Sequence, residues 1–368
     1  MAIGNFVIFN LMKKRRFSWI LLLLLALLIK LFSLFPDAVE KYYSQGLYVG
    51  LSRFWRTLFG WAPFSVGDLL YGTLIIWVLI TVIRVIKKIR KKQTDRSYWK
   101  NLLANSIRLA LVVYVTFNLF WGLNYNRKGI AWQLELETGP MEKQDLVAVM
   151  LLLRDKVNSL DTVAHQRRGA IDSKRYLFDG AVTAYKQLAI SDKRFAYPSV
   201  SLKPSLFSYL GNYLGYTGYY NPFTGEAQVN TTVPLFIQPF TSCHEIGHQL
   251  GYAKENEANF AGYLAASVST DTVFQYSVYF DLYSYGRPYL YYQDSMLLKK
   301  LDSSLNKGVR NDFRELKKFA EKHANPIEVI IDKLYGQYLK ANEQPDGKVT
   351  YGKVMVWLVA RFKRDGKV

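Results

Sequence analysis

The sequence predicts a fold in two parts: three N-terminal transmembrane α-helices and, after them, a mostly helical α+β domain. Long apolar runs fill the first third of the chain, whereas helical periodicity dominates the rest. The composition agrees, because a chain of 368 residues that is 50% hydrophobic and 15% aromatic is too apolar to be disordered. One cysteine excludes an intrachain disulfide framework and any cysteine-rich zinc or iron–sulfur site.

Three runs near the N-terminus are long and apolar enough to cross a bilayer. They cover Phe17–Phe35, Leu69–Ile86 and Leu102–Leu123, and the third continues to Tyr125. Its end residues Trp121 and Tyr125 suit the membrane–water interface. The first run could also be a signal peptide, but no small-residue cleavage site follows it, so we expect a retained anchor. The prediction is a membrane domain over 17–125 after a basic N-terminus at 1–16.

The basic residues indicate the direction of these spans. Residues 1–123 carry 17 Lys and Arg against 4 Asp and Glu, so they hold most of the net charge of +19. Lys and Arg gather before the first run and in the loop 87–100, whereas the loop between the first two runs has few. The positive-inside rule then puts the N-terminus in the cytoplasm and residues 126–368 outside it. The expected location is the cytoplasmic membrane, with the lipid bilayer as partner and no nucleic acid.

Residues 126–368 form one domain-sized piece with predominantly helical periodicity. Between about 190 and 238 the pattern changes to alternation and turn residues, and a strand is expected at Ala227–Thr231. These features predict an α+β domain. The expected helices cover Glu142–Leu160, Ser173–Leu188, Phe240–Gly251, Glu255–Ser269, Thr272–Tyr285, Asp312–His323 and Pro326–Lys340.

The motif that carries chemistry is HEIGH at residues 244–248. In a helix, His244 and His248 lie on one face, so that their ring nitrogens can bind one Zn²⁺ ion. Glu245 would then lie beside the water that occupies the open position of a catalytic zinc, where it could act as general base. Two solvated or core histidines are the plainer interpretation. The downstream sequence favours the zinc site.

A catalytic zinc site of this kind needs a third protein ligand. The metzincin pattern fails, because Lys254 stands where its third histidine would be and a lysine repels the metal. The segment Glu255–Asn259 fits instead the gluzincin pattern, in which a glutamate comes from a second helix. Glu255 is then the expected ligand, with Asn259 as outer-shell support for a histidine. Glu257 remains the alternative, since a turn at Gly251 could absorb an offset of two residues.

The stretches GYYNPFTGEAQVN, PFTSCHEIGHQLGYAKENEANFAGYLA and DGKVTYGKVMVWL resemble an uncharacterised family of bacterial membrane proteins. That family has N-terminal spans followed by a zincin-like domain that bears HExxH. The part from HExxH to the second helix is also similar to gluzincin-type peptidases. The resemblance implies a zincin-like metallopeptidase fold with Zn²⁺ as cofactor, and it implies no substrate.

Two further groups of residues complete the expected site. In zincin folds an edge strand beside the motif helix pairs with extended substrate, and Glu226, Ala227, Gln228, Val229 and Asn230 are expected to form it. Tyr351 or Tyr220 could donate a hydrogen bond to an oxyanion.

The sequence thus predicts a membrane-anchored zinc metallohydrolase, most simply a peptidase, that acts on peptide, protein or cell-envelope substrates outside the cytoplasm. The alternative is a zincin-shaped module that binds or assembles such polymers without cleaving them.

Overall fold

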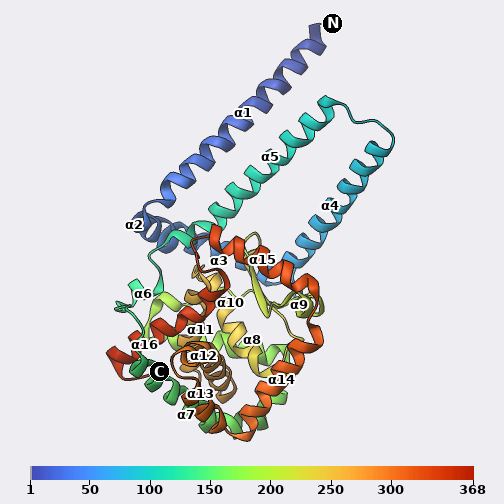
Figure 1. The fold of residues 1–368 in the computed structure, drawn as a ribbon. Coiled ribbons are helices and arrows are strands. Elements are labelled where there is room, and N and C mark those ends of the chain that lie inside the picture. Colours follow the sequence, from blue (N-terminus) through green and yellow to red (C-terminus); the bar gives the residue numbers. More distant parts are fainter. Residues whose placement is uncertain (1) are drawn as a thin grey trace. The chain divides into compact units, whose positions relative to one another are not determined.

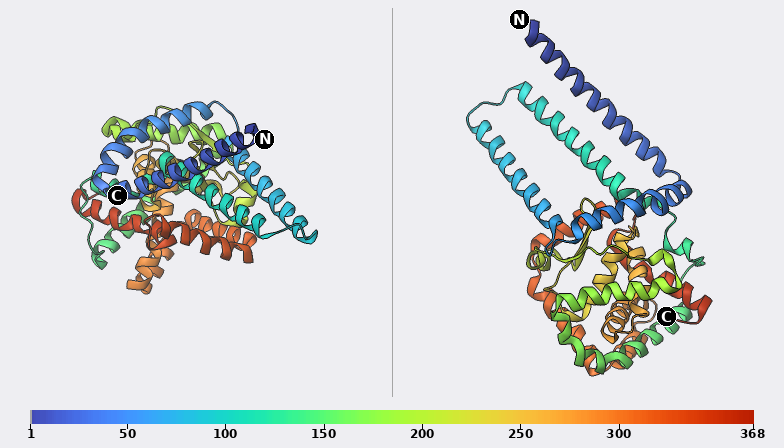
Figure 2. Two further views of the ribbon diagram at one scale, coloured as in Figure 1. Left: turned by 90° about the horizontal axis from the view of Figure 1, so that it is seen from above. Right: turned by 180° about the vertical axis from the view of Figure 1, so that it is seen from behind.

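The computed structural model describes residues 2–368, and it describes side chains from Phe17 onward except those of Lys348 and Tyr351. The chain forms two compact units (Figures 1 and 2). Unit 1 comprises residues 1–48 and 69–127, and unit 2 comprises residues 49–68 and 128–368. The segment 49–68, which lies between two of the apolar runs, is therefore part of the same unit as the C-terminal domain.

Unit 1 is built from long apolar helices and three short connecting helices. Its elements are α1 (Ala2–Ser33), α2 (Pro36–Ala38), the π-helix η1 (Val39–Leu47), most of α4 (Val66–Arg90), α5 (Arg96–Phe120) and the 3-10 helix η2 (Gly122–Asn126). Among the described residues, α4 and α5 are each long and apolar enough to cross a membrane. Phe17–Ser33 reaches that standard only together with Pro36–Gly60, with a bend of 98° between them. Within the part of the chain that the structure describes, there are therefore two such helices, or three if the bent pair is one span.

The end of the third apolar run differs from the prediction. Helix α5 stops at Phe120, and the chain continues as η2 rather than as a span to Tyr125. Trp121 and Tyr125 are buried, at 5% and 3% exposure, so they pack inside protein instead of facing a membrane interface. The two rings pack against one another edge to face, with centroids 5.0 Å apart.

A buried ion pair holds η1 against the end of η2. The Arg127 guanidinium donates to both carboxylate oxygens of Glu40, at 3.0 Å from Nε and 2.8 Å from Nη2. Tyr43 of η1 also donates to the carbonyl oxygens of Asn118 and Leu119 at the end of α5. Burial of two charges is tolerated here because the pairing is bidentate.

Unit 2 is mostly helical, as the sequence predicts, and its small sheet makes it α+β. All seven predicted helices are present; α7, α12 and α14 are longer than expected, and the ends of the others differ by a few residues. Its helices are α3 (Tyr48–Gly60), α6 (Gly129–Gln133), α7 (Lys143–Arg167), α8 (Lys174–Ser191), α9 (Ser208–Leu214), α10 (Gln238–Gln249), α11 (Glu255–Ser267), α12 (Thr272–Gln293), α13 (Ser295–Ser303), α14 (Lys307–His323), α15 (Pro326–Ala341) and α16 (Val354–Asp365). Short 3-10 helices are η3 (Arg168–Asp172), η4 (Lys193–Phe195), η5 (Leu235–Ile237) and η6 (Gly347–Lys353).

The sheet of unit 2 has the strand order β1–β3–β2. Strand β3 (Glu226–Val229) lies between β1 (Leu202–Pro204), which is parallel to it, and β2 (Gly218–Asn221), which is antiparallel. The predicted edge strand over Glu226, Ala227, Gln228, Val229 and Asn230 is therefore wrong in position, because both sides of β3 are already paired. The edge strand nearest the motif helix in sequence is β2, which the sequence pattern did not predict.

Helix α10 lies in the middle of unit 2, and all 12 of its residues are buried (Figure 1). It packs on α11, α8 and α12 and on strands β2 and β3. Apolar side chains of the helix, among them Phe240, Cys243 and Ile246, join the main hydrophobic core. The polar motif residues of α10 are thus surrounded by protein, so each of them needs a specific partner.

Candidate metal centre

The approach of α11 to α10 depends on small residues. A Cβ atom at Gly247 would lie 3.2 Å from Ala258 Cα, and one at Gly262 would lie 3.0 Å from the backbone nitrogen of His244. Larger side chains at these positions would force the two helices apart. Gly251, with φ of +88°, turns the chain between the helices in a conformation that glycine adopts at low cost. This packing brings the first turn of α11 back to the histidines.

Three ligand-type side chains meet at one point. Glu255 Oε2 lies 3.3 Å from His244 Nε2 and 3.5 Å from His248 Nε2. The ligand atoms of the three residues all lie within 4.8 Å of one another, and all three residues are buried. Among the described residues, this is the group of His, Cys, Asp and Glu that could hold a metal ion. The donors suit zinc, because two imidazole nitrogens and one carboxylate leave a fourth position open.

Each histidine is held by a hydrogen bond on its other nitrogen. His244 Nδ1 donates to Asn259 Oδ1 at 2.7 Å, and His248 Nδ1 donates to the carbonyl oxygen of Tyr252 at 2.8 Å. Such bonds fix the ring orientation and direct Nε2 toward the shared point, as they do in metal sites. Asn259 therefore lies where the sequence predicts it.

The second oxygen of Glu255 is also held. Tyr335 of α15 donates to Glu255 Oε1 at 2.7 Å, which leaves Oε2 for the histidines. The backbone N–H of Glu255 donates to Gln344 Oε1 at 3.0 Å, beyond the end of α15. Oε2 itself is buried and has no well-formed hydrogen bond. A buried carboxylate oxygen in that state is suited to a cation, so the donor set fits a metal ion.

Burial and the Glu255 carboxylate together shift the pKa values of the two histidines at the shared point. Burial lowers the pKa of His244, although Glu255 opposes this. For His248 burial acts in the same direction, but the nearby Glu255 carboxylate prevails and raises the pKa to about 9. The two imidazoles outweigh burial at Glu255 and hold its pKa well below the usual range. The site is thus built around a carboxylate that stays ionised.

Glu245 points toward the edge of the sheet. A Cβ atom on Gly218 of β2 would lie 2.6 Å from Glu245 Oε1 and 2.9 Å from Thr241 Cγ2. Only a glycine leaves room for the carboxylate beside the strand. Burial raises the pKa of Glu245 to about 8, with Glu255 adding to the effect and His248 opposing it. Glu245 Oε2 is buried without a hydrogen-bond partner.

The remaining predicted site residues, Glu257, Tyr220 and Tyr351, lie outside the cluster of His244, His248 and Glu255 or outside the described side chains. Glu257 points to the opposite side of α11, where its Oε1 would lie 2.0 Å from a Cβ on Gly129, so it is not part of the cluster. Tyr220 lies on β2 two residues from Gly218, hence on the same face of the strand, and it is partly exposed. The side chain of Tyr351 lies outside the described residues.

Sequence reasoning missed three contributors: Gly218, Tyr335 and Gln344. Gly218 begins a short strand whose signal is weak. Tyr335 and Gln344 reach Glu255 from 80 and 89 positions away in the sequence, and no local pattern reports such a contact.

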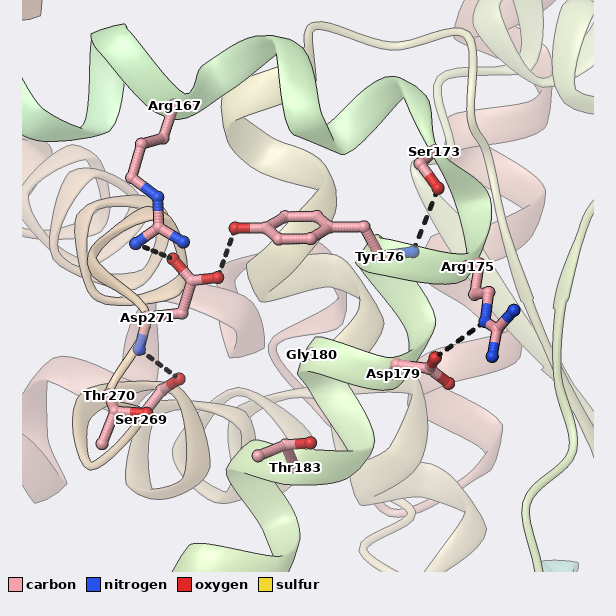
Figure 3. Close-up of a pocket in the computed structure, with 10 residues that line it drawn as sticks. All are labelled: Arg167, Ser173, Arg175, Tyr176, Asp179, Gly180, Thr183, Ser269, Thr270 and Asp271. Atoms are coloured by element: carbon pink, nitrogen blue, oxygen red, sulfur yellow. Dashed lines mark hydrogen bonds and ion pairs between the residues drawn. The ribbon is translucent and has the colours of Figure 1, made fainter.

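A separate pocket of about 530 Å³ lies between α7, α8 and the start of α12. Figure 3 shows hydrogen bonds and ion pairs among most of its polar groups. Asp271 caps α12 through the N–H of Val273 and accepts a hydrogen bond from Tyr176, while Arg167 lies 3.4 Å away. His244, His248 and Glu255 do not line this pocket. Its Ser173 and Asp271 cap the first turns of α8 and α12.

The comparisons with known proteins give one result. A search of curated proteins and a search of solved structures found no match. A family model described as protein of unknown function (DUF3810) matches residues 43–359, which includes the metal cluster, the sheet and α15. The chain therefore belongs to the DUF3810 family.

Proposed function

We propose that this chain is a membrane-anchored, zinc-dependent hydrolase of gluzincin type that cleaves peptide bonds. The observation that carries the proposal is the meeting of His244, His248 and Glu255 at one buried point, with Glu245 beside it. Three protein ligands and an open fourth position are typical of catalytic rather than structural zinc.

The chemistry of a bound metal would be simple. Zn²⁺ held by the three residues would polarise a carbonyl group and lower the pKa of a coordinated water. His244, His248 and Glu255 would hold the ion, and Asn259, Tyr252 and Tyr335 would keep those ligands oriented.

Glu245 supplies the proton transfer that peptide hydrolysis requires. Its carboxylate is buried between α10 and β2, next to the ligands and without a competing hydrogen bond on Oε2. From there it accepts a proton from the attacking water and delivers it to the leaving amine. An extended chain on the edge of β2 would pass this carboxylate.

Strand β2 is suited to hold such a chain. The Asn230 N–H donates to Thr217 O at 2.8 Å, and the antiparallel alternation then directs Tyr219 and Asn221 to β3. Gly218 therefore presents its N–H and C=O groups to the outer side of β2, away from β3. A peptide added there would gain main-chain hydrogen bonds with little sequence preference. This replaces the predicted role of the strand at 226–230.

The membrane setting is part of the proposal. The chain has helices long and apolar enough to cross a membrane, and the loop charges favour an active site outside the cytoplasm. Substrates would then be peptides, proteins or peptide-bearing polymers of the cell envelope.

The decisive experiment compares Glu245→Gln with the wild-type full chain in detergent. Both proteins are stripped with a chelator, reloaded with Zn²⁺, assayed for metal by mass spectrometry, and incubated with a mixed-sequence peptide library. We expect both to bind one Zn²⁺ and only the wild type to cleave. Glu321→Gln, on the exposed surface of α14, is the matched control and should cleave like wild type.

Three results would count against the proposal. Absence of stoichiometric zinc in the wild type would remove the metal centre. Equal cleavage by Glu245→Gln would remove the general base. Zinc and peptide binding without any cleavage would favour the non-catalytic binding module instead.

A further inference from the structure

Helix α15 is amphipathic, but its polar side is turned inward and its apolar side outward. Its inward side carries Glu328, Asp332 and Tyr335, and Tyr335 contacts the metal ligand Glu255. Its outward side carries Ile327, Ile330 and Leu334, which are 60%, 60% and 57% exposed. Intervals of three and four residues place these apolar side chains in one stripe. A helix that turns isoleucines and a leucine outward needs a partner other than water.

Helix α9 extends this apolar surface. Leu206, just before α9, is 53% exposed, and Tyr209 and Leu210 within it are 68% and 52% exposed. Helices α9 and α15 pack together, and Asn325 at the start of α15 donates to the carbonyl oxygen of Tyr213 at 2.8 Å. We refer to six exposed apolar side chains of this surface as the α9–α15 face: Leu206, Tyr209, Leu210, Ile327, Ile330 and Leu334.

This face is attached to the beginning of an apolar helix that can cross a membrane. The backbone N–H of Leu206 donates to Asp68 Oδ2 at 2.6 Å, and Ser205 Oγ donates to the same oxygen at 3.2 Å. Asp68 lies in the first turn of α4, and Leu69 follows it directly as the start of the apolar run. Leu206 is therefore held beside the residue that directly precedes the apolar run.

The residues just before α4 support the same location. Trp61 is 79% exposed and Phe64 is 43% exposed, and both precede the run by a few positions. Lys203 of β1 donates to the carbonyl oxygens of Gly60 and Ala62, so this loop lies beside the strand that leads to α9. Exposed aromatic side chains in such a place are typical of the membrane–water interface.

We propose that the α9–α15 face binds the bilayer surface, with its apolar side chains at the boundary of headgroups and acyl chains. The charges of α15 agree with a lipid partner. Its acidic residues Glu328 and Asp332 are turned inward, whereas Lys333 and Lys340 are exposed and can reach lipid phosphates. Because Tyr335 projects from the inner side of the same helix, lipid contact would hold the metal centre close to the membrane and favour substrates located there.

The test uses the full chain in liposomes of phosphatidylethanolamine and phosphatidylglycerol. An environment-sensitive fluorophore is attached to Leu334→Cys, Leu210→Cys or, as control, Tyr292→Cys, and quenching by nitroxide-labelled lipid is measured. Tyr292 is 88% exposed at the end of α12 and outside the α9–α15 face. The native Cys243 is fully buried, so the wild-type chain serves as the labelling blank.

We expect the probes at positions 334 and 210 to show blue-shifted emission and several-fold greater quenching than the probe at 292. Equal quenching at all three positions would overturn the proposal. Blue-shifted emission that lipid does not quench, and that grows with the protein-to-lipid ratio, would assign the face to a second copy of the chain instead. None of these outcomes depends on zinc or on peptide cleavage.

Discussion

Among its described residues, unit 2 brings histidine, carboxylate and tyrosine side chains together at the candidate metal centre and again between α7, α12 and α14. In the second cluster, His165 Nε2 lies 3.3 Å from Asp312 Oδ1, and Tyr276 donates to the other oxygen of Asp312. Arg168 Nη2 donates to both of these oxygens at 2.6 Å. The carboxylate of this cluster is thus fully paired.

The difference lies in the source of positive charge. Asp312, at 1% exposure, receives a permanent cation from the chain itself, because a guanidinium stays protonated at any ordinary pH. Glu255 faces two imidazoles, which can give up their protons and become metal ligands. The first arrangement joins three helices, and the second is the one for which we propose a metal ion. Residue type alone does not separate them.

The largest expected effect is on zinc binding. His248→Ala removes one of two imidazole ligands and should abolish stoichiometric zinc in the purified full chain. His165→Ala, in the cluster that has its own cation, should leave one Zn²⁺ per chain. Elemental analysis of both variants after dialysis against a chelator and reloading measures this. Zinc retained in His248→Ala would show that His248 is not a zinc ligand and that the cluster around Glu255 is not the zinc site.

The second effect separates the two glutamates of α11. Glu255→Gln should weaken zinc binding by more than the roughly 10–100-fold that loss of an outer-shell partner costs, because it removes a ligand. Glu257→Gln should keep wild-type affinity, since that side chain faces Gly129. Competition with a chelator of known affinity measures both variants. The reverse result would mean that the turn at Gly251 sets a different register of α11.

These two predictions also show what the sequence could provide. His244, Glu245 and His248 lie within one helical turn, so helix periodicity alone places their side chains. The choice of Glu255 over Glu257 needed the packing of Gly247 on Ala258, which is a contact between helices. The central position of β3 could not be predicted, because it depends on a parallel partner of only three residues, Leu202–Pro204. The end of α5 at Phe120 likewise depends on packing in unit 1.

The third effect is on stability rather than on metal. Arg168→Ala leaves Asp312 buried without its cation, and this should lower the free energy of unfolding by about 3 kcal/mol. We take the lower end of the usual range because the Arg168 side chain is 20% exposed. Denaturant unfolding of the detergent-solubilised chain measures the change. The folded fraction should still bind one Zn²⁺, and loss of zinc would indicate that the clusters are coupled.

The smallest effect compares one hydroxyl in each cluster. Tyr335→Phe removes the hydrogen bond to Glu255 Oε1, and Tyr276→Phe removes the one to Asp312. A hydrogen bond to a carboxylate contributes about 1.5 kcal/mol or somewhat more. For Tyr335 that energy orients a ligand, so we expect about tenfold weaker zinc binding. For Tyr276 it joins two helices, so we expect a similar loss of unfolding free energy with zinc affinity unchanged.

The two substitutions are matched, since each deletes one oxygen and keeps the ring. Zinc affinity and unfolding free energy are measured on both variants. We expect a crossed pattern, in which Tyr335→Phe loses mainly zinc affinity and Tyr276→Phe loses mainly unfolding free energy. Equal loss of zinc affinity in both variants would point to a general loosening of unit 2. A crossed pattern would instead show that the same bond, a tyrosine hydroxyl on a buried carboxylate, orients a ligand at Glu255 and stabilises the fold at Asp312. The cation that faces each carboxylate decides between these roles.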